Sequence, residues 1–178
     1  MLRYGYKLFR KNKNGELLPL YVNATKVVPL NEVLYAECGQ MTENGKVKSR
    51  LGELAYRPGW HLNEDAPFVT HIYSKHKGKK YLKDGCVWCL VEYGGTDYQS
   101  EANECGRNKK GKIIAKNAYL KRIPEGGFYR YKTNPNMTGA WIISGEMKVV
   151  RELSQEEVVQ ICLENGYAEA DILRPYVK

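Results

Sequence analysis

Long uncharged apolar runs are absent from this sequence, although 43% of its 178 residues are hydrophobic. A membrane-spanning helix needs about 20 consecutive apolar residues, so that class of protein is excluded. The segment from Met1 to Lys7 has neither the apolar stretch nor the cleavage site of a signal peptide. Cysteine occurs five times, an odd number, which favours free thiols over a disulfide framework. We therefore expect a cytoplasmic protein with its own buried core.

Motifs with an established chemistry are also missing. The glycine pairs Gly94-Gly95 and Gly126-Gly127 stand alone, so the sequence has no phosphate-loop or dinucleotide fingerprint. No RNP aromatic pair, helix-turn-helix or zinc-finger pattern occurs. Cys86 and Cys89 lie three residues apart in a predicted strand, where their side chains point to opposite faces. We therefore expect buried structural thiols, no metal site and no cofactor for the leading function below.

Turn residues and apolar runs predict a chain rich in strands. Asn14-Gly15 predicts one hairpin, and Asn44-Gly45 predicts a second that joins residues 33–38 to 46–48. The apolar run 86–93 is typical of a central strand that is covered on both faces. Further strands are expected at 128–131, 140–144 and 147–153.

Three segments carry helix signals. Asp65-Ala66-Pro67 predicts the start of a short helix, and a second short helix is expected over 97–106. Ser154-Gln155-Glu156-Glu157 is a capping box that begins the clearest helix. The predicted fold class is α+β, mostly antiparallel strands with a short mid-chain helix and a capped C-terminal helix. We expect one domain over residues 1–166, with a short C-terminal tail, 167–178, packed on it or extending from it.

Positive charge exceeds negative charge, with 28 Lys and Arg against 20 Asp and Glu and a formal net charge of +8. The excess gathers in the N-terminus and in two later segments, whereas acids gather in the C-terminal helix. Such clustering favours contact with a phosphate backbone, and neighbouring tyrosines are candidates for stacking on bases. The alternative is that the lysines are only solvated and the tyrosines pack. The predicted contacts to nucleic acid or to a partner are Lys75, Lys77, Lys79, Lys80, Lys83, Arg107, Lys109, Lys110, Lys112, Lys116, Lys121, Arg122, Arg130 and Lys132, with Tyr73, Tyr81, Tyr119, Tyr129 and Tyr131 as stacking candidates.

Arg57-Pro58-Gly59-Trp60-His61 places a turn, a guanidinium, an indole and an imidazole within five residues. One interpretation is a rigid turn in which Trp60 is anchored in the core and His61 bonds to backbone. The other is a catalytic role for His61, because buried titratable groups gather at active sites.

This block resembles a family of small proteins encoded by bacteriophages, prophages and other mobile elements. The resemblance extends to Tyr6-Lys7-Leu8-Phe9-Arg10, to the segment around Trp88, and to Trp141-Ile142-Ile143 with Met147-Lys148. It implies a protein that acts in the cytoplasm of a host cell. Accessory proteins of this kind include counter-defence proteins that block nucleic-acid-guided nucleases, so the resemblance implies an anti-CRISPR-like role as one possibility.

A second resemblance is to ADP-ribosyltransferase-like domains. The corresponding positions are Arg10 on an early strand, Gly59-Trp60-His61 before a short helix, and Glu146 at the start of a late strand. The resemblance implies that Arg10 or His61 holds NAD and that Glu146 stabilises the charge that develops at the anomeric carbon. The doubled acidic motif of those enzymes is incomplete, because position 144 is serine.

The sequence therefore leads to three hypotheses. The first is a non-catalytic phage or mobile-element accessory protein whose basic loops bind nucleic acid or a host ribonucleoprotein. The second is an NAD-dependent enzyme that uses Arg10, His61 and Glu146. The third is a structural or assembly protein of a phage particle.

Overall fold

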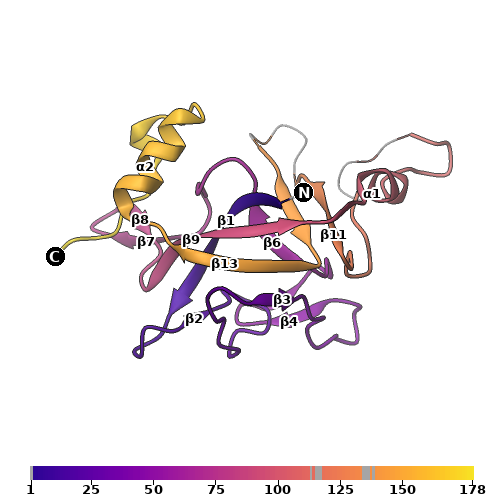
Figure 1. Ribbon diagram of the computed structural model, residues 1–178, viewed down its shortest axis with the longest axis horizontal. Coiled ribbons are helices and arrows are strands. Elements are labelled where there is room, and N and C mark those ends of the chain that lie inside the picture. Colours follow the sequence, from indigo (N-terminus) through magenta and orange to yellow (C-terminus); the bar gives the residue numbers. More distant parts are fainter. Residues whose placement is uncertain (1, 113, 115–117, 134–136, 138) are drawn as a thin grey trace.

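The computed structural model describes residues 2–112, 114, 118–133, 137 and 139–178. Strands dominate these residues (Figure 1). The strands are β1 (Leu2–Lys11), β2 (Leu17–Leu18), β3 (Val33–Tyr35), β4 (Val47–Ser49), β5 (Gly52–Leu54), β6 (Trp60–Asn63), β7 (Tyr73–His76), β8 (Lys79–Leu82), β9 (Cys86–Gly94), β10 (Thr96–Asp97), β11 (Gly127–Tyr131), β12 (Trp141–Ser144) and β13 (Glu146–Glu152). The helices are α1 (Gln99–Cys105), α2 (Gln155–Glu164) and a short 3-10 turn, η2 (Glu169–Asp171).

One nine-stranded sheet organises the chain in the order β10-β11-β12-β6-β1-β9-β13-β3, and β2 pairs with β1 beside this path. Its centre is the long antiparallel pairing of β1 with β9, from Leu2 opposite Gly94 to Arg10 opposite Cys86. Two small hairpins, β4-β5 and β7-β8, stand outside this sheet. The apolar run 86–93 therefore forms a central strand, as its composition predicted.

The expected α+β class is wrong. The chain is 38% strand and 12% helix, and the described residues form two α-helices, α1 and α2, so the fold is dominated by its sheet. The helix expected from Asp65-Ala66-Pro67 onward does not form, because residues 65–72 are irregular and Tyr73 begins β7. The apolar side chains of this segment are still buried from an irregular backbone. Asn63 supplies a bond that a helix would otherwise make, because its side-chain amide donates to the Phe68 carbonyl at 2.8 Å.

The two Asn-Gly turns have different outcomes. Gly15 has φ 78° in a turn that joins β1 to β2, as predicted. Gly45 also has a positive φ, but its turn pairs Met41 with Val47 and does not use residues 33–38. Those residues instead form β3, which pairs with β13. The error arose because an edge of the main sheet, distant in sequence, competes for β3.

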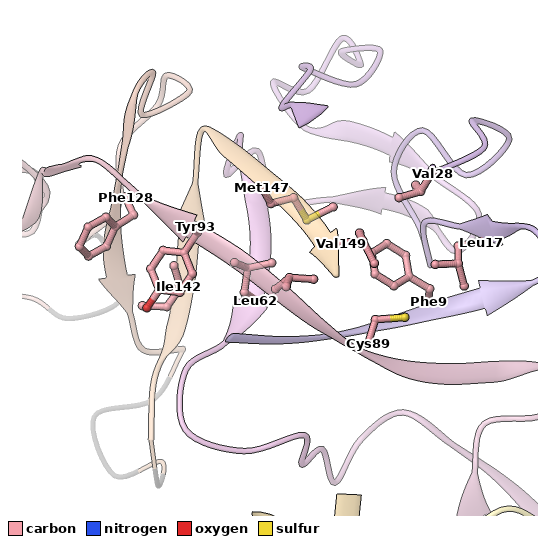
Figure 2. Close-up of a cluster of buried hydrophobic side chains, with 11 residues drawn as sticks. Phe9, Leu17, Val28, Leu62, Cys89, Tyr93, Phe128, Ile142, Met147 and Val149 are labelled. Carbon is pink, nitrogen blue, oxygen red and sulfur yellow. The ribbon is translucent and has the colours of Figure 1, made fainter. Parts of the chain in front are cut away.

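The two faces of the central sheet carry separate apolar clusters. On one face Phe9 packs in the cluster of Figure 2, and on the other Leu8 packs with Trp88. Cys89 belongs to the first cluster and Cys86 to the second, as expected for residues three apart on a strand. All five cysteines are free thiols, of which three are buried and two exposed. Figure 1 shows α2 and the β2–β4 region on opposite sides of the sheet.

Both remaining helix predictions are confirmed. α1 begins after Tyr98, which occupies the N-cap position without a side-chain capping bond, and the Asp97 carboxylate accepts from the Gln99 amide at 2.9 Å. In α2 the Ser154 hydroxyl accepts from the Glu157 amide at 3.1 Å, and the Glu157 carboxylate accepts from the Ser154 amide at the same distance. Hydrogen bonds from Arg151 and from the Ser154 backbone lower the pKa of Glu157 to about 2.

Replacing the capping hydroxyl, Ser154→Ala, is expected to lower the free energy of unfolding by about 1 kcal/mol, since one amide at the start of α2 loses its partner. Urea unfolding followed by circular dichroism measures this change. Ser100→Ala is the matched control, because Ser100 is an exposed serine in α1. Equal destabilisation by both substitutions would contradict a capping role.

Candidate nucleic-acid interface

The first predicted basic segment forms the β7-β8 hairpin. Lys77 and Gly78 make its turn with φ values of 50° and 78°, a combination that fits a two-residue hairpin. Leu82 and the preceding Ile72 are buried and anchor the hairpin to the core. The five lysine side chains of this segment are all exposed; they are Lys75, Lys77, Lys79, Lys80 and Lys83.

These five lysines have no carboxylate partner among the residues that the structure describes. The single acid within residues 73–84 is Asp84, and it bonds to His76 at 3.2 Å. That hydrogen bond lowers the pKa of the Asp84 carboxyl. The hairpin therefore presents concentrated positive charge: five lysines against the single acid Asp84, which bonds to His76.

Aromatic rings hold the hairpin to the C-terminal segment. His76 stacks on Tyr176 with ring centroids 4.0 Å apart, and Tyr81 meets the same ring edge-on at 5.1 Å. The Lys80 ammonium lies 4.5 Å from the centre of the Tyr73 ring. The Leu82 amide donates to the Arg174 carbonyl at 2.8 Å, so residues 174–176 lie along β8.

The stacking role predicted for the tyrosines is wrong for two of the five. Tyr129 and Tyr131 are buried beneath α1, so their rings are not available to bases. Tyr119 packs edge-on against Tyr131 at 5.7 Å. In the hairpin, Tyr73 is covered by lysine and Tyr81 contacts Tyr176. Tyr73, Tyr81 and Tyr119 are half-buried, so each keeps part of its ring exposed.

The second predicted basic segment has a different electrostatic character. Its arginines are engaged by carboxylates: Arg107 with Glu104 at 3.0 Å, Arg122 with Glu101 at 2.6 Å, and Arg130 with Glu64 at 2.6 Å. The exposed cations that remain are Lys109, Lys110, Lys112, Lys121 and Lys132, and Lys116 lies outside the described residues.

The two basic segments do not form one surface. Figure 1 shows the β7-β8 hairpin near one end of the long axis of the molecule and α1, with the loop that follows it, near the other. A ligand of moderate size would therefore contact one of them at a time. Because the hairpin combines full exposure with lysines that have no acid partner in the described chain, it is the better candidate interface.

The residues predicted for the NAD-dependent enzyme do not converge. Arg10 Nε donates to the Pro19 carbonyl at 3.1 Å, and its guanidinium also bonds to Ala24. On β9, Arg10 is opposite Cys86 and Lys148 is opposite Glu92. Because β13 is antiparallel to β9, Glu146, two residues before Lys148, lies at the level of Gly94. Eight residues of β9 separate those levels, roughly 26 Å along the strand.

His61 lies elsewhere, in a cleft of about 1330 Å³ that neither Arg10 nor Glu146 lines as far as the structure describes it. The Arg57–His61 block forms the rigid turn of the first interpretation. Trp60 Nε1 donates to the Leu34 carbonyl at 3.1 Å, and His61 Nε2 contacts the Arg57 carbonyl at 2.8 Å. A carbonyl only accepts, so Nε2 carries the proton. Burial lowers the pKa of His61 to about 4, so the ring is neutral at pH 7.

Comparisons with protein-family models, with curated proteins and with solved structures find no match. Over residues 2–112, 114, 118–133, 137 and 139–178, no helix has the length and apolar character needed to cross a membrane. In the same ranges, no three His, Cys, Asp or Glu side chains are grouped as metal ligands would be.

Sequence reasoning missed two residues that matter for the sites. Lys7 interrupts the apolar pattern of β1, and this interruption was the available signal, because a lysine between buried neighbours must find a polar partner. Tyr176, in the C-terminal tail, stacks against the hairpin, and no pattern in the neighbouring sequence predicts that contact.

Acid should weaken the fold partly through His61. Its pKa is about 4 in the folded chain and about 6.5 when unfolded, so the unfolded chain binds more protons between these values. The free energy of unfolding should therefore fall as pH drops from 6.5 to 4, by on the order of 2 kcal/mol from this group.

His61→Gln, which keeps a donor for the Arg57 carbonyl, should reduce that loss in urea titrations at several pH values. The exposed His71 provides the control, His71→Gln, and an unchanged pH profile in His61→Gln would contradict the assignment.

Proposed function

We propose that this protein binds nucleic acid, alone or within a host ribonucleoprotein, through the β7-β8 hairpin and without catalysis. The observation that carries the proposal is the set of five exposed lysines on residues 73–84, which have no carboxylate partner among the described side chains. Exposed lysines without acid neighbours attract the counterion-rich phosphate backbone, and the release of those counterions drives binding.

The shape of the hairpin suits such contact. Lys75 is directly opposite Lys80, and His76 is opposite Lys79, so charges lie on both strands near the tip. Like charges opposite one another destabilise a strand pair, and an anion placed between them relieves the repulsion. A two-stranded ribbon also fits the major groove of B-form DNA. Because lysines contact phosphate without reading base edges, we propose binding with little sequence preference.

The proposed setting is the phage or mobile-element accessory role implied by the resemblance of the Arg57–His61 block. A basic surface that competes for guide or target nucleic acid would suit a counter-defence protein. The fold also supports the specific use of the hairpin, because its anchoring to the core and to Tyr176 holds the lysines in a fixed arrangement.

The affinity for a short DNA duplex or a single-stranded RNA should fall steeply with salt. With up to five phosphate contacts, the slope of log affinity against log salt should approach about −4.5 for duplex DNA. The triple variant Lys77→Glu, Lys79→Glu, Lys80→Glu should flatten that slope by about 0.9 for each phosphate that the hairpin no longer binds, and it should weaken binding at least tenfold at low salt. Fluorescence anisotropy over a range of salt concentrations measures both quantities.

The matched control is the triple variant Lys109→Glu, Lys110→Glu, Lys112→Glu at the other end of the molecule. Three Lys-to-Glu changes shift the net charge by −6 in each variant, from +8 to +2. If both variants weaken binding equally, net charge rather than the hairpin governs it. A wild-type affinity that does not change with salt would reject the proposal outright.

A further inference from the structure

A cleft opens where two strands of the central sheet part. β1 and β6 pair at one position, Tyr6 opposite Asn63, and β1 next gains a partner on this edge at Arg10, opposite Leu18 of β2. Between these points the edges of β1 and β6 diverge, and the cleft of about 1330 Å³ includes this gap. It is therefore built into the sheet and is separate from the β7-β8 hairpin.

The cleft reaches both faces of the sheet. Lys7 and Trp60 belong to the face of the Figure 2 cluster, because Lys7 alternates with Leu8 and Trp60 packs on that cluster. His61 and Trp141 belong to the opposite face, where Trp141 packs against the cluster of Leu8 and Trp88 and against a further cluster that contains Tyr129 and Ile143. All four residues line the same cavity.

Lys7 is a cation within this cleft. Its Nζ donates to the His61 carbonyl at 2.8 Å, which satisfies one of its three donors. The ammonium also lies 5.9 Å from the centre of the Trp60 ring. Burial lowers the pKa of Lys7 to about 8, so it is mostly charged at pH 7 but incompletely solvated.

Arg57 supplies a second cation to the cleft. Its guanidinium lies 4.9 Å from the centre of the Tyr131 ring, and its Nε is buried without a hydrogen-bond partner in the described part of the chain. A buried donor on a charged group is costly to leave unsatisfied, so this atom indicates a missing acceptor.

The carboxylates around the cleft do not neutralise these two cations. Glu37 pairs with Lys26, and Glu64 pairs with Arg130 at 2.6 Å. Asp65 and Asp171 are exposed. Because His61 is neutral, Lys7 and Arg57 give the interior of the cleft a positive charge.

We propose that this cleft binds a small planar aromatic anion, with its ring against the indole side chains and its carboxylate or phosphate against Arg57 and Lys7. The half-buried Trp60 and Trp141 offer flat apolar surface, and the two cations fix the position of the charge. An aromatic body with one charged group matches both parts of the lining, whereas a purely apolar ligand would leave the buried Arg57 donor unsatisfied.

Isothermal titration calorimetry with the full chain tests the proposal, using AMP and 2-naphthoate as aromatic anions. Adenosine supplies the ring of AMP without the charge, and inorganic phosphate supplies the charge without the ring. We expect at least one aromatic anion to bind ten times more tightly than adenosine and inorganic phosphate. A preference for AMP identifies phosphate as the recognised group, and a preference for 2-naphthoate identifies carboxylate.

Two variants test the cations. Arg57→Gln and Lys7→Met should each weaken binding of the preferred probe about tenfold, since each removes a charged hydrogen bond. Lys121→Met removes an exposed lysine outside the cleft and should leave binding unchanged. The hairpin triple variant should also bind normally, so failure of the hairpin proposal and failure of this one are distinguishable.

A measurement on the unmodified sequence keeps the proposal testable if a variant does not fold. Acetylation by an N-hydroxysuccinimide ester, read by mass spectrometry, should be slowed at Lys7 by saturating probe and unchanged at Lys121. The proposal is overturned if no probe binds below millimolar concentration, or if Lys7 is not protected from acetylation. It is also overturned if adenosine binds as tightly as AMP and 2-naphthoate binds no more tightly than either.

Discussion

The antiparallel pairing of β1 with β9 is the constraint on which the other elements depend. It runs without interruption from Leu2 opposite Gly94 to Arg10 opposite Cys86. This register decides, for each side chain of the two strands, on which of the two faces of the sheet it lies. Leu8 and Trp88 therefore share one core, while Phe9 packs in the other. A slip of one residue would exchange the two sets and disrupt the packing of both apolar layers. The same alternation places Lys7 on the face of Phe9, opposite to Leu8.

Features decided by neighbouring residues were predictable from the sequence. The capping box of α2, the Asn14-Gly15 turn and the central position of β9 each depend on a few adjacent residues, and the structure confirms them. Features decided by distant partners were not predictable. β3 pairs with β13 rather than with its neighbour in sequence, and residues 65–72 bury apolar side chains without forming a helix. The fold class was wrong for this reason: tertiary contacts outweighed local helix signals.

Charge shows the same division. The sequence located both basic segments, but it did not show that Arg130 pairs with Glu64, 66 residues away, or that the segments lie apart. The two basic segments, which have similar positive charge in the sequence, therefore differ in how much of that charge is free to contact a ligand. Ion pairs engage the arginines of the second segment, two of them with acids distant in sequence, whereas the hairpin lysines have no carboxylate partner among the described residues. The cleft was missed because it depends on the divergence of β1 from β6, and that divergence leaves no local pattern.

Lys7 and Arg57 belong to a different physical class from the hairpin lysines, although all contribute to the net charge of +8. The hairpin cations are surrounded by water and by mobile ions, which screen charges over about 8 Å at physiological ionic strength. The cleft cations are partly removed from solvent, and screening there is much weaker. Raising the salt concentration therefore weakens ionic binding at the hairpin far more than ionic binding in the cleft. The two surfaces thus respond differently to salt concentration, because the burial of each cation, not its charge, determines how strongly solvent and ions screen it.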